Sequence, residues 1–273
     1  MSGQHIVVHA GFHKTGTTAI QSFLADNGPH LWPHMALVLP GRIGPVSKCA
    51  TLHSVMQDPL TLEEYHGRLT AFLQTLHLGK KRHLLISCED LAGLIPGRGG
   101  HENYATCPVL LLATKVAIRD VFGPDMALSF YMCTRDQDAW LRSSYWQNLR
   151  VSKLKMDYDP YAATYRDAAN FKSILAQAQT LLGDTPIVTR ALEDTGALRF
   201  GPATPLIDLF PLPPDCLDAL APPQARNVSP DSALIAQMLA VNKSALSEND
   251  CFAHKKALFA DYIAAQTQGN SGP

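Results

Sequence analysis

The sequence has no excess of charge of either sign. Its 23 Lys and Arg residues nearly balance 24 Asp and Glu residues, which gives a formal net charge of −1 over 273 residues. Proteins that bind nucleic acid commonly carry a basic field that neutralises phosphates, so we expect no nucleic-acid partner. No apolar run reaches the roughly 18 residues that a membrane-spanning helix needs. We therefore expect no membrane span. Because the first strand begins by His5, which leaves no room for a leader segment, we also expect a cytoplasmic location.

Patterns typical of metal sites and disulfides are also missing. The six cysteines are scattered without a C-x-x-C spacing, and the 11 histidines form no H-E-x-x-H pattern. The cysteines mostly lie in apolar surroundings, which indicates buried free thiols rather than disulfides or zinc ligands. We expect no bound metal. No internal repeat is present, and the sequence does not indicate an oligomeric state.

Short apolar segments alternate with helical patterns along the first 190 residues. This alternation predicts an α/β fold: a single domain with a five-stranded, mainly parallel sheet that is flanked by helices. The predicted strands are Ile6–His9, Met35–Leu39, His83–Ser87, Ala127–Cys133 and Pro186–Thr189. The predicted helices cover Thr17–Asp26, Leu62–Leu76, Val109–Phe122, Asp138–Lys153, Tyr161–Leu182, Pro230–Leu246 and Phe252–Ala265.

Prolines gather after the fifth predicted strand. Residues 191–228 contain seven of them, which excludes long regular elements. Apolar residues such as Leu206, Ile207 and Phe210 nevertheless give this segment something to bury. We interpret it as an ordered excursion within one domain of residues 1–273, between an α/β core at 1–190 and C-terminal helices at 229–267.

The most informative segment joins the first strand to the first helix and reads Gly11-Phe12-His13-Lys14-Thr15-Gly16-Thr17-Thr18. Amides left unpaired at a helix start, together with the helix dipole, favour an anion, and Lys14 adds a positive charge. The segment therefore predicts a loop that binds a phosphate or a chemical relative of one. In nucleotide triphosphatases the lysine follows the second glycine directly, whereas here Lys14 precedes Gly16.

The order Gly-x-x-Lys-Thr-Gly-Thr-Thr resembles the 5′-phosphosulfate loop of sulfotransferases that use 3′-phosphoadenosine 5′-phosphosulfate (PAPS), notably bacterial members. The resemblance implies a P-loop-type fold, PAPS as donor, adenosine 3′,5′-bisphosphate as product and no requirement for metal. It implies that Lys14 neutralises the leaving oxygen. The donor would be bound by Gly11, His13, Lys14, Thr15, Gly16, Thr17 and Thr18.

A second motif follows the fourth predicted strand. Arg135 stands at the end of that strand, and Ser143 lies eight residues later in the next predicted helix. In the sulfotransferase family an arginine and a serine at this separation hold the 3′-phosphate of PAPS, although Gln137 stands where many members have proline. Taken alone, Arg135 would equally suit a surface ion pair with Asp136 or Asp138.

A third segment, Arg226-Asn227-Val228-Ser229-Pro230, resembles a late loop of the bacterial relatives that closes over the nucleotide. The resemblance makes Arg226 and Asn227 candidates for nucleotide contact. Ser229 followed by Pro230 also reads simply as the start of a helix.

The acceptor of a sulfuryl group needs a general base within reach. Glu89, which directly follows Cys88 at the end of the third strand, is the first candidate, and a helix-starting role is its alternative. His53 and His13 are the second and third candidates. We expect a hydroxyl or amine acceptor, from a carbohydrate or a small metabolite. The competing hypotheses are a P-loop kinase of a small metabolite and an inactive relative that binds nucleotide or carbohydrate.

Overall fold

The computed structural model describes residues 3–79, 82–223 and 230–269 and contains a five-stranded sheet in which every pair of neighbours is parallel. The strands are β1 (His5–His9), β2 (Met35–Val38), β3 (His83–Ser87), β4 (Ala127–Thr134) and β5 (Ile187–Ala191), in the order β2-β3-β1-β4-β5. This confirms the predicted α/β fold, and each predicted strand matches to within two residues. Because β1 lies between β3 and β4 and all three strands are parallel, the segments that follow them meet at the carboxyl ends of the strands.

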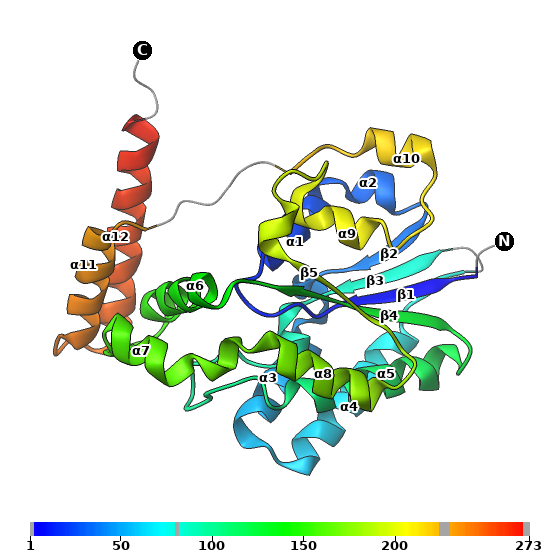
Figure 1. Ribbon diagram of the computed structural model, residues 1–273, viewed down its shortest axis with the longest axis horizontal. Coiled ribbons are helices and arrows are strands. Elements are labelled where there is room, and N and C mark those ends of the chain that lie inside the picture. Colours follow the sequence, from blue (N-terminus) through cyan, green and yellow to red (C-terminus); the bar gives the residue numbers. More distant parts are fainter. Residues whose placement is uncertain (1–2, 80–81, 224–229, 270–273) are drawn as a thin grey trace. The chain divides into compact units, whose positions relative to one another are not determined.

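One face of the sheet packs against the first helix and the proline-rich segment. The elements on this face are α1 (Thr17–Asp26), α2 (Gly28–Leu31), α9 (Thr204–Ile207) and α10 (Pro214–Ala219) (Figure 1). Val7 and Leu85 of the sheet share a core with Phe23 of α1 and with Leu206, Ile207 and Phe210. Each such side chain stabilises the fold by roughly 1.5–3 kcal/mol on leaving water. As far as residue 223, the proline-rich segment is therefore ordered by burial, as its apolar residues predict.

Four longer helices cover the opposite face: α3 (Pro40–Met56), α4 (Pro59–Gln74), α5 (Cys107–Phe122) and α8 (Phe171–Leu182) (Figure 1). Successive strand residues point to opposite faces, so Ile6, Val8 and Ile86 face this layer, and all three are fully buried. All six cysteines of the chain are buried free thiols, as predicted.

Helix α3 is absent from the sequence prediction, which places no helix between the second strand and Leu62–Leu76. Its two glycines and two prolines in the first six positions resemble loop punctuation. Ile43, Val46, Ala50 and His53 nevertheless recur at spacings of three and four and are buried. Packing of this stripe outweighs the poor intrinsic propensity of the segment.

The helix predicted over Tyr161–Leu182 is wrong as a single element. The structure divides it into α7 (Tyr158–Tyr165), a 3-10 turn at Asp167–Ala169 and α8. The division occurs at Asn170, whose side chain accepts a hydrogen bond from the Ser173 amide at 3.3 Å and so starts α8.

The chain divides into two compact units. The first holds the sheet and comprises Met1–Asp136 and Asn170–Gln224, and the second comprises Gln137–Ala169 and Ala225–Pro273. The helices of the second unit are α6 (Gln137–Val151), α7, α11 (Ser232–Lys243) and α12 (Glu248–Gly269). Tyr145, Trp146 and Leu149 of α6 form its core with Leu234 and Met238 of α11. In the part of the chain that the structure describes, no helix has the length and apolar character needed to cross a membrane.

Candidate functional site

The loop between β1 and α1 ends in a helix start that has no side-chain cap. The cap residue Gly16 has φ 96° in the left-handed region, and the Ala19 and Ile20 amides donate to its carbonyl at 3.0 and 3.2 Å. The amides of Thr17 and Thr18 come earlier and have no partner within the helix. A β-carbon on Gly16 would lie 2.7 Å from Leu192 Cδ1. The sequence thus builds a compact loop whose amides and helix dipole favour an anion.

Gly11 is required by close packing under the same loop. A β-carbon there would lie 2.9 Å from His9 Nε2 and 3.3 Å from Thr17 Cγ2. Both contacts are shorter than ordinary van der Waals separations, so a larger residue would displace the loop from the end of β1. Glycine is needed at the two positions for different reasons: positive φ and a close side chain at Gly16, close packing alone at Gly11. Both glycines allow the same tight turn.

The polar side chains of the loop do not all face outward. Thr15 is fully buried, and its hydroxyl donates to the Phe12 carbonyl at 2.6 Å. Thr17 is also buried, Lys14 is half-buried and Thr18 is exposed. Of the three threonines that the sequence predicts to bind the donor, Thr18 is therefore the exposed one. The Thr15 hydroxyl instead stabilises the fold of the loop.

Arg135 follows β4 and reaches the loop directly. Its Nη1 donates to the Lys14 carbonyl at 3.0 Å, across 121 positions of sequence. Partial burial lowers the pKa of the Arg135 guanidinium, and the carboxylates of Glu193 and Asp136 oppose that shift. Its Nε is buried without a hydrogen-bond partner among the described residues. The structure thus brings together the two residues on which the prediction depends most.

The remaining predicted nucleotide contacts lie elsewhere in the chain. Ser143 is half-buried on α6 and belongs to the second unit. Arg226 and Asn227 lie outside the described residues. The loop and Arg135 together are therefore the part of the predicted site whose geometry the structure describes.

Two carboxylates stand at the end of β3, next to the loop. Glu89 Oε2 accepts a hydrogen bond from Gln21 Nε2 of α1 at 2.6 Å. Asp90 Oδ1 lies 3.0 Å from His13 Nε2, and its Oδ2 accepts a weak bond from Ser47 at 3.4 Å. These contacts place Glu89 beside the helix that the loop begins and attach Asp90 to the loop itself.

The two candidate histidines occupy different surroundings. His13 lies between Asp90 and Tyr104, whose hydroxyl is 3.3 Å from His13 Nδ1. His53 is buried in the last turn of α3, with its Nδ1 2.8 Å from the Thr61 hydroxyl. Burial lowers the pKa of His53, while Asp58 raises it. The loop contacts therefore involve His13, whereas His53 joins α3 to α4.

Sequence reasoning missed His9, the last residue of β1. Its ring is fully buried under the loop, with Nδ1 2.8 Å from the Ser87 hydroxyl and Nε2 3.8 Å from Cys133 Sγ. Burial lowers the pKa of His9 to about 3. The local sequence marks His9 only as the end of an apolar strand, because its polar partners come from two distant strands.

The buried neutral His9 should make the fold sensitive to acid. Its pKa is lower in the native chain than the 6.5 of an exposed histidine, so below about pH 6.5 the unfolded chain binds a proton that the native chain does not. The free energy of unfolding should fall by about 1.4 kcal/mol per pH unit from this residue alone. Urea unfolding between pH 6.5 and 4.5 measures the slope.

The control for this slope is substitution at two histidines. His9→Gln should flatten the slope by about 1.4 kcal/mol per pH unit, whatever it does to the absolute stability. His77→Gln, at an exposed position, should leave the slope as it is in the original chain. Equal slopes for His9→Gln and the original chain would show that His9 is not the acid-sensitive group.

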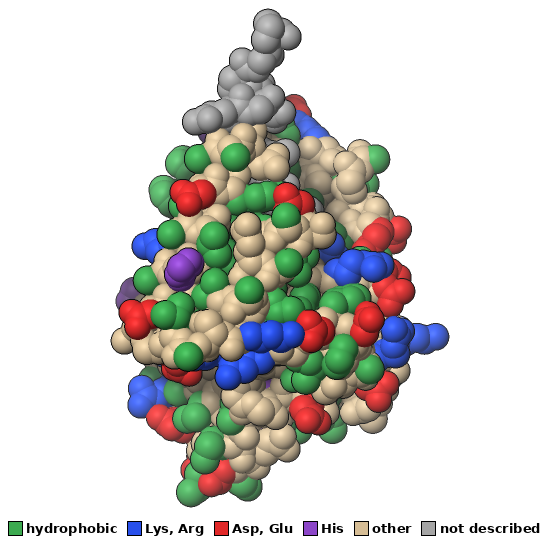
Figure 2. All heavy atoms as spheres, turned by 90° about the vertical axis from the view of Figure 1, so that its left-hand side faces the viewer, with side chains coloured by type: hydrophobic (Ala, Val, Ile, Leu, Met, Phe, Trp, Pro, Cys, Tyr) green, Lys and Arg blue, Asp and Glu red, His purple; other side chains and the backbone are tan. Residues whose placement is uncertain are grey.

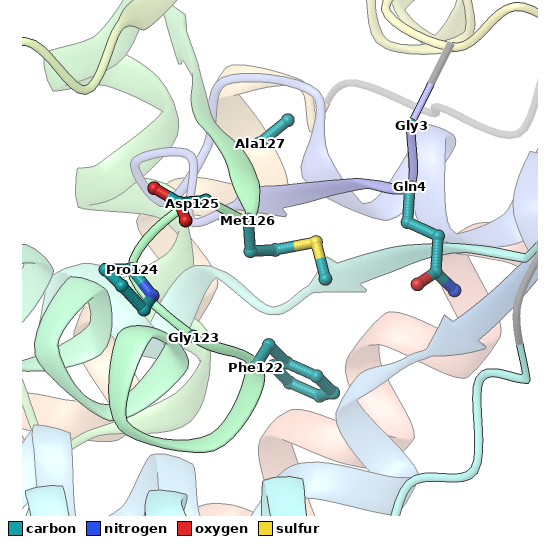
Figure 3. A pocket seen from close by; sticks show the side chains of 8 residues that line it. All are labelled: Gly3, Gln4, Phe122, Gly123, Pro124, Asp125, Met126 and Ala127. Atoms are coloured by element: carbon teal, nitrogen blue, oxygen red, sulfur yellow. The ribbon is translucent and has the colours of Figure 1, made fainter. Parts of the chain in front are cut away.

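Away from the loop, Figure 3 shows a shallow pocket at the opposite edge of the sheet, beside the amino ends of β1 and β4. Among the described residues that line it, Asp125 alone is charged. The face in Figure 2 carries acidic and basic side chains interspersed. Within the described residues, no three His, Cys, Asp or Glu side chains are arranged to hold a metal ion. The loop between β1 and α1, with Arg135 and Glu89, is the stronger candidate site.

Comparisons of the chain with protein-family models, with curated proteins and with solved structures gave no match.

Proposed function

We propose that the chain is a sulfotransferase that moves a sulfuryl group from PAPS to a hydroxyl or amine of an acceptor. The observation that carries the proposal is the loop from Gly11 to Thr18, which offers uncapped helix amides and Lys14 at the carboxyl end of the central strand, with Arg135 in contact. Sulfuryl transfer asks the protein mainly to hold an anionic donor and to neutralise charge on the leaving oxygen. This set of residues suits both tasks.

Thr15 favours sulfuryl transfer over magnesium-dependent phosphoryl transfer. In nucleotide triphosphatases the hydroxyl that directly follows the loop lysine binds magnesium. Here that position is Thr15, which is fully buried with its hydroxyl donated to the Phe12 carbonyl. No carboxylate follows β2 directly, since Leu39 and Pro40 stand there. Both features weigh against the kinase hypothesis.

The proposed reaction assigns roles to the charged residues and the helix amides of the site. The acceptor oxygen attacks sulfur, the bond from sulfur to the 5′-phosphate oxygen breaks, and adenosine 3′,5′-bisphosphate leaves. Lys14 neutralises the departing phosphate, the Thr17 and Thr18 amides hold it, and Arg135 binds the 3′-phosphate. Ser143, Arg226 and Asn227 remain proposed nucleotide contacts on the strength of the resemblance.

Glu89 is the favoured general base. Its Oε2 is hydrogen-bonded to Gln21, and its second oxygen has no hydrogen bond to any described residue. His13 has both ring nitrogens near polar partners, and the His53 ring is bonded to Thr61. Glu89 therefore offers an accessible lone pair to the proton of the acceptor. A carbohydrate or small-metabolite acceptor and a cytoplasmic location belong to the same proposal.

Nucleotide binding and label transfer test the proposal. Calorimetry should detect adenosine 3′,5′-bisphosphate binding that is unaffected by a chelator, and ³⁵S-labelled PAPS should transfer label to a member of an acceptor panel of sugars, phenols and amines. Magnesium-dependent ATP turnover without bisphosphate binding would instead favour the kinase. Binding without transfer to any acceptor would favour the inactive relative.

A further inference from the structure

Lys14 has an unfavourable backbone conformation that must be stabilised by contacts with other residues. Its φ is 66°, in the left-handed region that side chains with a β-carbon disfavour. In the described part of the chain, Gln57 is the one other non-glycine residue with positive φ. Gln57 follows the end of α3, where a left-handed residue is common, whereas Lys14 stands in the middle of a loop. Contacts with the surrounding structure must hold it there.

Those contacts come from three sides. Arg135 Nη1 donates to the Lys14 carbonyl at 3.0 Å. On the amino-terminal side His13 lies 3.0 Å from Asp90, and on the carboxyl-terminal side the Thr15 hydroxyl closes on Phe12. The bond from Arg135 is the one that acts on Lys14 itself, and its donor is charged, which makes it stronger than a bond between neutral groups.

The surroundings of Arg135 also fit a residue that supports the loop. Glu193 and Asp136 both act on the guanidinium charge, and Glu193 is held in place because its Oε1 accepts the Asp136 amide at 3.1 Å. Two carboxylates compete with a phosphate for the same cation. They do not compete for the hydrogen bond that Arg135 donates to the neutral Lys14 carbonyl, and their charges favour the cationic form of the donor.

We propose that Arg135 is a positioning residue for Lys14, which fixes the strained backbone of the loop through the Lys14 carbonyl. This inference rests on the proposed function and extends it. A residue that only gripped the 3′-phosphate would affect nucleotides that carry this group. A residue that positions the loop affects every nucleotide whose 5′-phosphate the loop binds.

Two nucleotides separate these roles, because adenosine 5′-monophosphate lacks the 3′-phosphate of adenosine 3′,5′-bisphosphate. Calorimetry of Arg135→Gln should show about tenfold weaker binding of adenosine 5′-monophosphate, and a loss at least as large for adenosine 3′,5′-bisphosphate. Arg135→Lys should recover part of the loss for both, because an ammonium also donates to a carbonyl. Weaker binding of the bisphosphate alone would overturn the proposal.

Trypsin supplies a measurement that needs no nucleotide. Cleavage after Lys14 requires the loop to open, so Arg135→Gln should accelerate cleavage of the bond between Lys14 and Thr15 by about tenfold. Cleavage after Lys115, within α5, reports general unfolding and should stay unchanged. The matched control is Arg190→Gln, at an exposed position on the neighbouring strand β5, which should leave both rates unchanged.

The outcomes distinguish this inference from the proposed function. If the original chain binds neither nucleotide, the proposed function fails. The rate of trypsin cleavage after Lys14 still decides the role of Arg135. An unchanged rate at Lys14 in Arg135→Gln, or an equal rise at Lys14 and Lys115, overturns the positioning role. A selective rise at Lys14 supports it.

Discussion

Replacing Lys14 by alanine should lower the rate of sulfuryl transfer by about a hundredfold to a thousandfold and leave the chain folded. The ammonium group is the proposed neutralising charge for the departing 5′-phosphate, and its charge matters most as the bond from sulfur to oxygen breaks. Alanine carries a β-carbon as lysine does, so the backbone strain at φ 66° stays the same. The measurement is transfer of label from ³⁵S-labelled PAPS, with thermal unfolding followed in parallel.

The matched control for Lys14→Ala is Lys172→Ala, at an exposed position on α8. It removes the same charge and side chain at a site far along the sequence from the loop. Its transfer rate should equal that of the original chain. A Lys14→Ala chain that is folded and retains full transfer activity would exclude Lys14 from the reaction.

Replacing Glu89 by glutamine should lower kcat by about a hundredfold to ten-thousandfold. The amide has nearly the shape of the carboxylate and still offers an oxygen to Gln21 Nε2, yet it cannot take a proton from the acceptor. The affinity for adenosine 3′,5′-bisphosphate should therefore stay within a few-fold of the original. Steady-state kinetics and calorimetry on one preparation measure both quantities.

Two further variants sharpen the Glu89 experiment. His53→Ala should weaken the junction of α3 and α4, because it removes the ring that bonds Thr61, and should leave kcat nearly unchanged. Glu102→Gln, which removes a carboxylate at an exposed position, should change neither kcat nor the affinity for adenosine 3′,5′-bisphosphate. A large loss of kcat in His53→Ala with full activity in Glu89→Gln would reverse the assignment of the base.

The sheet and the outline of the candidate site are largely predictable from sequence. Strands such as His83–Ser87 are short apolar runs bounded by polar residues, and this local pattern is enough to locate them. The glycine and lysine pattern likewise marks the loop, because a turn from strand to helix imposes its own residue requirements. Helix α3 is harder to predict, because the glycines and prolines near its start are typical of loops. They outweigh the helical spacing of its buried residues in a reading of the sequence.

What the sequence cannot supply are contacts between distant segments. The bond from Arg135 to the Lys14 carbonyl joins residues 121 positions apart, and the pairing of His13 with Asp90 spans 77 positions. Neither residue pair shares a local pattern that would indicate the contact. The same holds for His9, whose partners Ser87 and Cys133 lie on separate strands.

The central place of β1 has a consequence for biosynthesis. Both of its neighbours come later in the chain, because Val7 is in register with Leu85 on one side and with Ser129 on the other. At about 5–20 residues per second, a ribosome needs roughly 6–24 s to pass from Lys14 to Arg135. Until β3 has been made the nascent apolar strand has no partner on either edge, and until β4 has been made one edge stays unpaired, which is the condition under which chaperones bind. Synonymous codons that change the speed of translation between these positions would therefore alter the yield of native protein more than codons after β5.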